Sequence, residues 1–320
     1  NAQVLNLEAA PADMMFPNIK RLKVKSSTAA TSVEWLNVAY RFPHLESLDF
    51  ATRNHQPVVE ELSQRAVENS WPWSRARRLR LDQSQLSSED MSRFLGCIEA
   101  YRVWRVPYAH MSTQSFEDLS QHFGSLEELD LGVSSEVASY MIRAILEFCP
   151  RLKVLRGGRV SSLDIAHGGP WACRSLRSLK LFVDTSATSP FSPASSSSSS
   201  PTTITAPIDQ GQLVLQRIGT LLYLEELDVS GLSMASQAGI EFSLKRGLGH
   251  LVGLKQLKEL RFKHTKQYME SDDIAWMLNS WPELKVVEGL LNCNSAFGSS
   301  RAASRLNTMM NRRVEFINDL

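Results

Sequence analysis

The chain has 320 residues, of which 43% are hydrophobic and 22% are charged, and its formal net charge is +1. A charge this close to zero gives no electrostatic reason to expect a nucleic acid or an anionic membrane as the main partner. No stretch approaches the roughly 18 consecutive apolar residues that a membrane-spanning helix needs. Composition and charge exclude no other class of protein, so the fold and the function have to be inferred from the order of the residues.

The two ends of the chain and its cysteines bear on its origin and compartment. The first residue is Asn, and Asn1–Leu7 is no signal peptide, so we expect the structure to begin upstream of residue 1. Cys97, Cys149, Cys173 and Cys293 are widely spaced, which favours small buried hydrophobic residues over zinc ligands or disulfides, although both of these stay open. With no Asn-x-Ser/Thr site, the cysteines indicate an intracellular protein, cytoplasmic or nuclear.

One apolar template recurs along the chain, and Phe123–Leu131 shows it most clearly. Leu129 and Leu131 are two residues apart, as on one face of a strand, and Asp130 between them points the other way. We find ten copies, each with four template positions: Phe16-Ile19-Leu22-Val24, Phe42-Leu45-Leu48-Phe50, Trp73-Ala76-Leu79-Leu81, Ile98-Tyr101-Trp104-Val106, Phe123-Leu126-Leu129-Leu131, Cys149-Leu152-Leu155-Gly157, Cys173-Leu176-Leu179-Leu181, Leu221-Leu224-Leu227-Val229, Leu254-Leu257-Leu260-Phe262 and Trp281-Leu284-Val287-Gly289.

The spacing of these copies is that of a repeat protein. Between successive third positions the steps are 26, 31, 25, 25, 26, 24, 48, 33 and 27 residues. Most of these steps fall in the range of about 20–29 residues that leucine-rich repeats have, and the longer ones indicate insertions. The same rhythm predicts a last strand over Val314–Phe316 and, less regularly, a first one over Leu5–Leu7.

Between the strands the apolar period changes from two to about 3.6, which predicts helices. The expected helices are 31–42, 58–70, 88–100, 134–148, 210–224, 234–248 and 271–280, with Ser88 as a plausible N-cap of the third. A single strand and helix cannot bury enough apolar surface to stand alone, so stacked neighbours must stabilise each other. The fold class is therefore α/β: a leucine-rich-repeat solenoid (horseshoe) with a parallel concave sheet of about ten to twelve strands and helices on the convex side.

A Ser/Pro-rich segment over 185–207 interrupts the solenoid, which otherwise spans residues 1–320 as a single domain. The segment contains an unbroken serine run and few apolar residues, so we expect a disordered loop. Ser189, Ser192 and Ser200 each precede a proline and could accept proline-directed phosphorylation, or the insertion is inert.

The residue between the third and fourth template positions is charged in all ten copies. These residues are Lys23, Asp49, Arg80, Arg105, Asp130, Arg156, Lys180, Asp228, Arg261 and Glu288. They form either a solvated ladder of cross-strand ion pairs or a concave surface that binds a protein partner, and the two can coexist. Phe182, predicted as an exposed aromatic anchor, joins the surface, and Arg21, Arg78, Val103, Lys263 and Leu290 flank it. Accordingly, Leu129→Asp should unfold the array, whereas Asp130→Arg should alter only binding.

No pattern indicates catalysis, and we expect no enzyme, no metal site and no cofactor. The seven histidines are scattered without the spacing of metal ligands. Gly247–Gly253 resembles a phosphate-binding loop only loosely, since its third glycine is one residue late and no strand precedes it. The pairs Trp71/Trp73 and Trp276/Trp281 favour core packing over sugar or base stacking.

The repeats at Phe42–Phe50, Cys149–Leu155 and Trp281–Leu284, of the form Phe/Cys/Trp-Pro-x-Leu, resemble the leucine-rich-repeat region of fungal F-box proteins. That resemblance implies an F-box ahead of the repeats, docked on the adaptor of a cullin-based SCF ubiquitin ligase, with the repeats holding the substrate. No F-box helix occurs in these 320 residues, so it would lie upstream of residue 1. The alternatives are a leucine-rich-repeat scaffold or adaptor unrelated to ubiquitination, and a repeat protein that is an enzyme or regulates GTPases.

Overall fold

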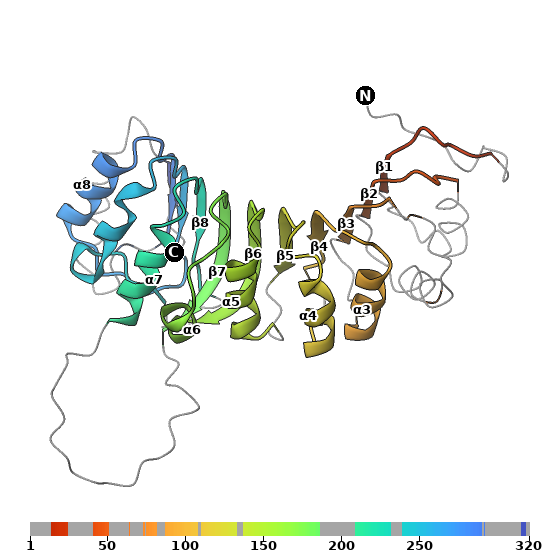
Figure 1. Cartoon of the computed structure of the whole chain (residues 1–320). Helices are drawn as coiled ribbons and strands as arrows, with labels where there is room; N and C mark the ends of the chain where they lie inside the picture. Colours follow the sequence, from red (N-terminus) through yellow and green to blue (C-terminus); the bar gives the residue numbers. More distant parts are fainter. Residues whose placement is uncertain are drawn as a thin grey trace, which may run out of the picture. The chain divides into compact units, whose positions relative to one another are not determined.

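The computed structural model describes residues 14–24, 41–50, 64, 73, 75–81, 87–107, 110–132, 137–185, 209–231, 239–289, 291 and 315–317. The chain forms two compact units, residues 1–137 (unit 1) and 138–320 (unit 2). Figure 1 labels their strands and helices. The strand expected over Leu5–Leu7 and the segment 186–207 with its three serines lie outside the described residues, as do nearly all of the helices expected over 31–42 and 58–70. That both units belong to one continuous solenoid stays a prediction.

Unit 1 is a ladder of parallel strands that follow one another in chain order. Its described strands are β1 (Arg21–Val24), β2 (Ser47–Phe50), β3 (Arg78–Leu81), β4 (Val103–Arg105) and β5 (Glu128–Gly132). Each pairs in parallel with the next. Two described helices, α3 (Ser88–Gly96) and α4 (Thr113–Ser120), pack against each other beside the strands.

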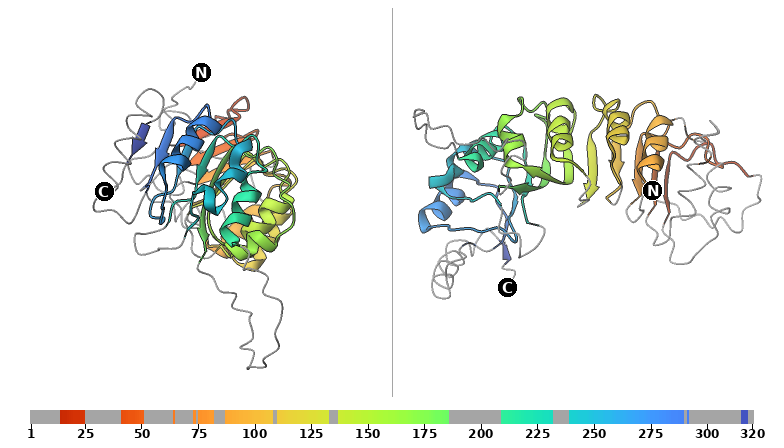
Figure 2. Two further views of the ribbon diagram at one scale, coloured as in Figure 1. Left: turned by 90° about the vertical axis from the view of Figure 1, so that its left-hand side faces the viewer. Right: turned by 90° about the horizontal axis from the view of Figure 1, so that it is seen from below.

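Unit 2 repeats the same arrangement. Its described strands are β6 (Val154–Ser161), β7 (Ser178–Asp184), β8 (Glu226–Asp228), β9 (Glu259–Arg261), β10 (Val286–Glu288) and β11 (Glu315–Ile317), all paired in parallel in chain order. Between them lie α5 (Ser139–Phe148), α6 (Ser162–His167), α7 (Gln210–Ile218), α8 (Ser271–Ser280) and two 3-10 helices, η1 (Leu244–Arg246) and η2 (Leu248–Gly253) (Figure 2). Strand β11 falls one residue later than expected.

The apolar template forms the core of both units. Third-position side chains are buried, and they stand opposite one another in adjacent strands: Leu79, Trp104 and Leu129 in unit 1, and Leu179, Leu227 and Leu260 in unit 2. Each buried side chain needs a neighbouring repeat on both sides to cover it, so many repeats have to stack in succession. The parallel pairing and the alternation of strands with helices confirm the α/β leucine-rich-repeat fold.

Tertiary contacts replace the helix predicted over 234–248. In its described part the chain is irregular up to Ser243 and then forms η1, which ends at Gly247 in the left-handed conformation (φ 98°). The backbone N–H of Phe242 donates to Gln267 Oε1 (2.7 Å), and that of Leu244 donates to Asp273 Oδ1 (2.8 Å). Side chains of the next repeat thus take the donors that an α-helix would use internally.

Other helix ends and two short helices also depart from the sequence prediction. Helix α3 is capped by Ser87, whose Oγ accepts the N–H of Asp90, and not by Ser88. Helices α5 and α7 are shorter than expected, whereas α8 has the predicted bounds. Helices α4 and α6 were not predicted, because eight and six residues hold too few turns to show a helical period.

The tryptophans and cysteines of the described chain are packing residues. The indole of Trp281 packs edge-on against Trp276 and donates its N–H to the carbonyl of Leu251 (3.0 Å). Cys149 and Cys173 are buried as unpaired thiols, and burial raises the pKa of Cys173 to about 12. Cys293 lies outside the described residues. Among the described residues no three His, Cys, Asp or Glu side chains are placed to hold a metal ion, and no helix is long and apolar enough to cross a membrane.

A buried histidine makes unit 1 sensitive to acid. His122 Nε2 lies 3.0 Å from the carbonyl oxygen of Leu95, and Nδ1 accepts the N–H of Tyr101 at 3.4 Å. This arrangement requires the neutral ring with its proton on Nε2. Burial lowers the pKa of His122 below its ordinary value of 6.5, outweighing the carbonyls of Leu95 and Glu99, which favour the charged form.

We expect the free energy of unfolding to fall as the pH drops from about 7.5 to 5.5, because the unfolded histidine takes up a proton that the folded one resists. In His122→Gln the same fall should be smaller, as measured by urea titration at each pH. His44→Gln, at an exposed site, serves as the control and should keep the wild-type pH dependence. Parallel curves for wild type and His122→Gln would show that His122 is not the group responsible.

Candidate partner-binding face

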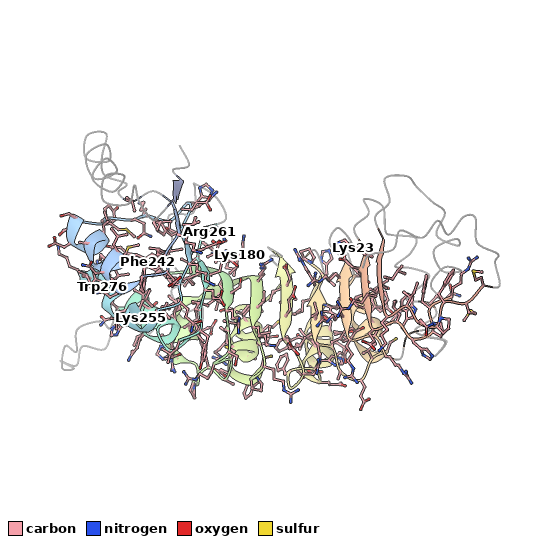
Figure 3. The ribbon with its side chains drawn as sticks, turned by 90° about the horizontal axis from the view of Figure 1, so that it is seen from above. Lys23, Lys180, Phe242, Lys255, Arg261 and Trp276 are labelled. Atoms are coloured by element: carbon pink, nitrogen blue, oxygen red, sulfur yellow. The ribbon has the colours of Figure 1, made fainter. Side chains whose placement is uncertain are left out.

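The ten charged residues predicted between the template positions lie in register along each unit. Asp49 stands opposite Lys23 and Arg80, and Arg105 stands opposite Arg80 and Asp130. In unit 2 the row runs Arg156, Lys180, Asp228, Arg261 and Glu288, with each residue opposite the next. On each unit, we call the surface formed by its part of this row and by the residues two positions before it the strand face of that unit. Figure 3 shows Lys23 on unit 1, and Lys180 and Arg261 on unit 2.

Ion pairs join neighbouring members of the row. The Nζ of Lys23 is 2.9 Å from Asp49 Oδ2, and the Nε of Arg105 is 3.2 Å from Asp130 Oδ2. In unit 2 Lys180 pairs with Asp228 at 3.1 Å, and Arg261 pairs with Glu288 at 3.1 Å. Cross-strand pairs that water can reach contribute only about 0.2–1 kcal/mol each. The ladder interpretation therefore describes real contacts, but these contacts do not account for the stability of the fold.

Two acids that were not predicted from the sequence hold arginines of the strand face, Glu128 on unit 1 and Glu226 on unit 2. Glu128 receives two hydrogen bonds from Arg80, at 3.0 and 3.2 Å, across two strands. Glu226 accepts from Ser178 Oγ (2.7 Å) and Arg261 (2.5 Å), and Arg156 lies 3.8 Å away. These acids stand two residues before the charged row, so the period of two could have identified them.

The surroundings of Glu226 keep it ionised. Burial by itself would raise its pKa, but the hydrogen bonds from Ser178 and Arg261 and the charges of Arg261 and Arg156 outweigh this and lower it. The carboxylate thus fixes the position of Arg261 and draws Arg156 across the strand between them. On this part of the strand face the positive and negative groups are held in place before any partner arrives.

Two of the predicted binding residues are buried structural groups. Asp130 and Asp228 are 7% and 4% exposed. Each accepts a backbone N–H two residues later, Asp130 from Gly132 (3.1 Å) and Asp228 from Ser230 (3.0 Å), and so fixes the turn that ends its strand. The flanking residue Val103 is buried too, and Leu290 lies outside the described residues.

The prediction that Phe182 is an exposed aromatic is wrong, because Phe182 is only 5% exposed. Strand β6 makes a bulge at Gly157 and Gly158 (φ 97° and 93°) and continues to Ser161. The bulge brings Arg159 opposite Phe182, with the guanidinium 5.6 Å from the ring centroid, and Arg159 is ion-paired with Asp184. Arg159 therefore covers the ring that was expected to face a partner.

Around Lys23 on unit 1 and Lys180 on unit 2, the accessible layer of the strand face is cationic. The side chain of Lys23 is 56% exposed and that of its partner Asp49 is 15% exposed, while Lys180 and Asp228 are 51% and 6% exposed. Long lysine side chains extend past the short aspartates and carry their charge into water. Arg21 and Arg78 add further exposed cations on unit 1. At these two pairs the acid lies beneath the lysine, and the ammonium group is what a partner would meet first.

Comparison with protein-family models and with curated proteins finds no match to this chain. Among solved structures, the yeast Rad7 and Elc1 complex matches with a TM-score of 0.50 and 11% sequence identity, covering 89% of this chain and 71% of the other. An internalin (InlF) of Listeria monocytogenes matches with a TM-score of 0.39 and 10% identity, covering 88% of this chain and 82% of that one. At such low identity the likeness to the yeast complex concerns the fold alone.

Proposed function

We propose that the chain is a protein-interaction module whose strand face binds an acidic segment of a partner protein. The observation that carries this proposal is the layering of charge, with an acid beneath each of the exposed cations Lys23 and Lys180. A partner carboxylate can pair with Lys180 without displacing Asp228, which also accepts the backbone N–H of Ser230. Arg80, Arg105 and Arg156 are half-exposed and would contribute the planar, two-pronged contacts that carboxylates favour.

We further propose that this module is the substrate-recognition part of an F-box/LRR-type SCF ubiquitin ligase subunit. The Phe/Cys/Trp-Pro-x-Leu repeats, which resemble those of fungal F-box proteins, support this assignment. The fold likeness to a structure that contains Rad7 with the partner protein Elc1 agrees with a binding role. In this proposal the adaptor and cullin bind through an F-box ahead of residue 1, and the substrate binds the strand face. An adaptor unrelated to ubiquitination would use the same face but recruit no cullin.

Affinity purification of the full-length protein from its own cells tests both levels. We expect a bound substrate together with the SCF adaptor and cullin. The double variant Lys23→Glu/Lys180→Glu should recover at least about tenfold less substrate. It should recover as much adaptor and cullin as the wild type, because the two charge reversals lie on the strand face alone. Lys245→Glu, which reverses a charge on η1, is the matched control and should keep both.

The two levels of the proposal fail in different ways. Unchanged substrate recovery with the double variant would exclude the strand face as the binding surface. Recovery of substrate with neither adaptor nor cullin would exclude the ligase and leave a scaffold or adaptor protein. Thermal unfolding of each variant, followed by circular dichroism, checks that the fold is intact.

A further inference from the structure

A second surface of unit 2 lies on the loops that lead into its strands, away from the strand face. We call it the entry edge and define it as residues 149–153, 173–177, 221–225, 254–258 and 281–285, with Val252. These loops lie side by side, because a ladder of backbone hydrogen bonds joins their last residues. The N–H of Arg177 donates to Lys153, that of Glu225 to Arg177, that of Lys258 to Glu225 and that of Lys285 to Lys258, all at 2.7–2.8 Å.

The entry edge is strongly basic. It carries seven cations, Arg151, Lys153, Arg174, Arg177, Lys255, Lys258 and Lys285, against two acids, Glu225 and Glu283, so its net charge is +5 while the whole chain has +1. One acid, Glu225, is shared between Lys258 (2.5 Å) and Arg177 (3.3 Å). Most of these cations are exposed, and Figure 3 places Lys255 apart from Lys180 and Arg261 on the strand face. A local excess of this size attracts anionic partners.

Exposed apolar side chains occupy the centre of this basic edge. Leu222, Tyr223 and Val252 are 55%, 53% and 50% exposed. Leu222 and Tyr223 are consecutive, and Leu222 also lies near the residue after Val252, since a Cβ placed on Gly253 would lie 3.0 Å from Leu222 Cδ2. The equivalent positions of the other entry loops carry Pro150 and Arg151, Arg174 and Ser175, Lys255 and Gln256, and Pro282 and Glu283.

The entry loops on either side of this apolar centre each carry a cation, and one of these cations, Arg174, lies next to it. Arg174 of the preceding loop donates to the carbonyl of Thr220 (3.4 Å), which holds its guanidinium beside the start of the 221–225 loop. Lys255 of the following loop donates to the carbonyl of Ser280 (3.0 Å). Single exposed apolar residues are common on protein surfaces, but an aromatic and a leucine side by side within a charged rim have the composition of a binding hot spot.

We infer that the entry edge binds an acidic segment of a partner protein that also carries leucine or aromatic residues. The apolar residues of that segment would cover Leu222, Tyr223 and Val252, and its carboxylates would pair with the surrounding cations. A nucleic-acid duplex would use the cations, but its backbone offers nothing to the exposed tyrosine and leucine. An anionic membrane is the other occupant that the experiment below tests. This inference does not depend on the proposed function, because the strand face shares no residue with the entry edge.

A random peptide library displayed on phage tests the inference directly. The library is selected on the 320-residue protein and counter-selected on Leu222→Ser/Tyr223→Ser/Lys255→Glu. We expect the recovered peptides to be enriched in Asp or Glu together with Leu, Phe or Trp. Synthetic fluorescein-labelled copies should bind the wild type, and Lys255→Glu or Tyr223→Ser should weaken binding at least about tenfold in fluorescence anisotropy. Added salt should weaken it further.

Matched controls separate this surface from the rest of the chain. Leu244→Ser and Lys245→Glu change an exposed leucine and an exposed lysine on η1, outside both proposed binding surfaces, so both should bind as the wild type does. The inference is overturned if no acidic-apolar peptides are enriched, or if the peptides bind the edge variants unchanged. It is equally overturned if a DNA duplex or phosphatidylserine vesicles bind in an edge-dependent way and the peptides do not.

Discussion

Leu129→Asp should abolish the cooperative unfolding transition of unit 1 or lower its free energy of unfolding by more than about 4 kcal/mol. Leu129 is fully buried in the stack of third-position side chains and stands opposite Trp104 in the neighbouring strand. An aspartate there would place an unpaired carboxylate among apolar groups, and it would also remove the contacts of the leucine.

Urea titration followed by tryptophan fluorescence measures this effect. Leu129→Ala separates the two contributions, because it leaves a cavity without a charge and should cost about 2–5 kcal/mol. Lys23→Gln, at an exposed position of the same unit, should stay within about 0.5 kcal/mol of wild type. A Leu129→Asp protein as stable as Lys23→Gln would mean that the template residues do not form the core.

Asp130→Arg should destabilise unit 1 by about 3–5 kcal/mol, in contrast to the sequence-based expectation that it alters only binding. The Asp130 carboxylate is buried, accepts the N–H of Gly132 and pairs with Arg105. An arginine would leave the Gly132 N–H without its acceptor and would place a second guanidinium beside Arg105.

The neutral substitution Asp130→Asn identifies the cause. Its amide oxygen can still accept from Gly132, so it should lose only about 1 kcal/mol, mainly from the pair with Arg105. Asp49→Asn, at the more exposed acid opposite Lys23, should change stability less than Asp130→Asn does. Thermal and urea unfolding of the three variants give the comparison. If Asp130→Arg is as stable as the wild type, Asp130 is an exposed surface residue and not a buried structural group.

The sequence predicted the strands well because a two-residue alternation fixes which side chains are buried. Leu79, Leu129 and Leu260 are buried where the template required it, and the ten charged residues between template positions stand in register within each unit. Helix α8 was also predicted at its exact bounds, since it is long enough to show its period and ends before Pro282.

The sequence predicted less well wherever a distant residue decides the local structure. The backbone over 240–244 gives its donors to Gln267 and Asp273 of the next repeat, and no local pattern reveals that competition. Phe182 is covered by Arg159 because β6 continues past a bulge at two glycines and brings Arg159 opposite Phe182. The exposure of Leu222 and Tyr223 between basic loops could not be predicted from the sequence, because it depends on which neighbouring elements cover them.

By itself the sequence determined that this is a repeat of short parallel strands with a charged residue between each pair of core side chains. The alternation within a strand and the period of about 25 residues can both be read from the sequence. Burial of the apolar face then requires the repeats to stack with their strands in register. The tertiary structure alone decided which of those charges a partner can reach. Exposure depends on side-chain length and on hydrogen bonds to neighbouring strands and turns, so the lysines extend into water while Asp130 and Asp228 stay buried.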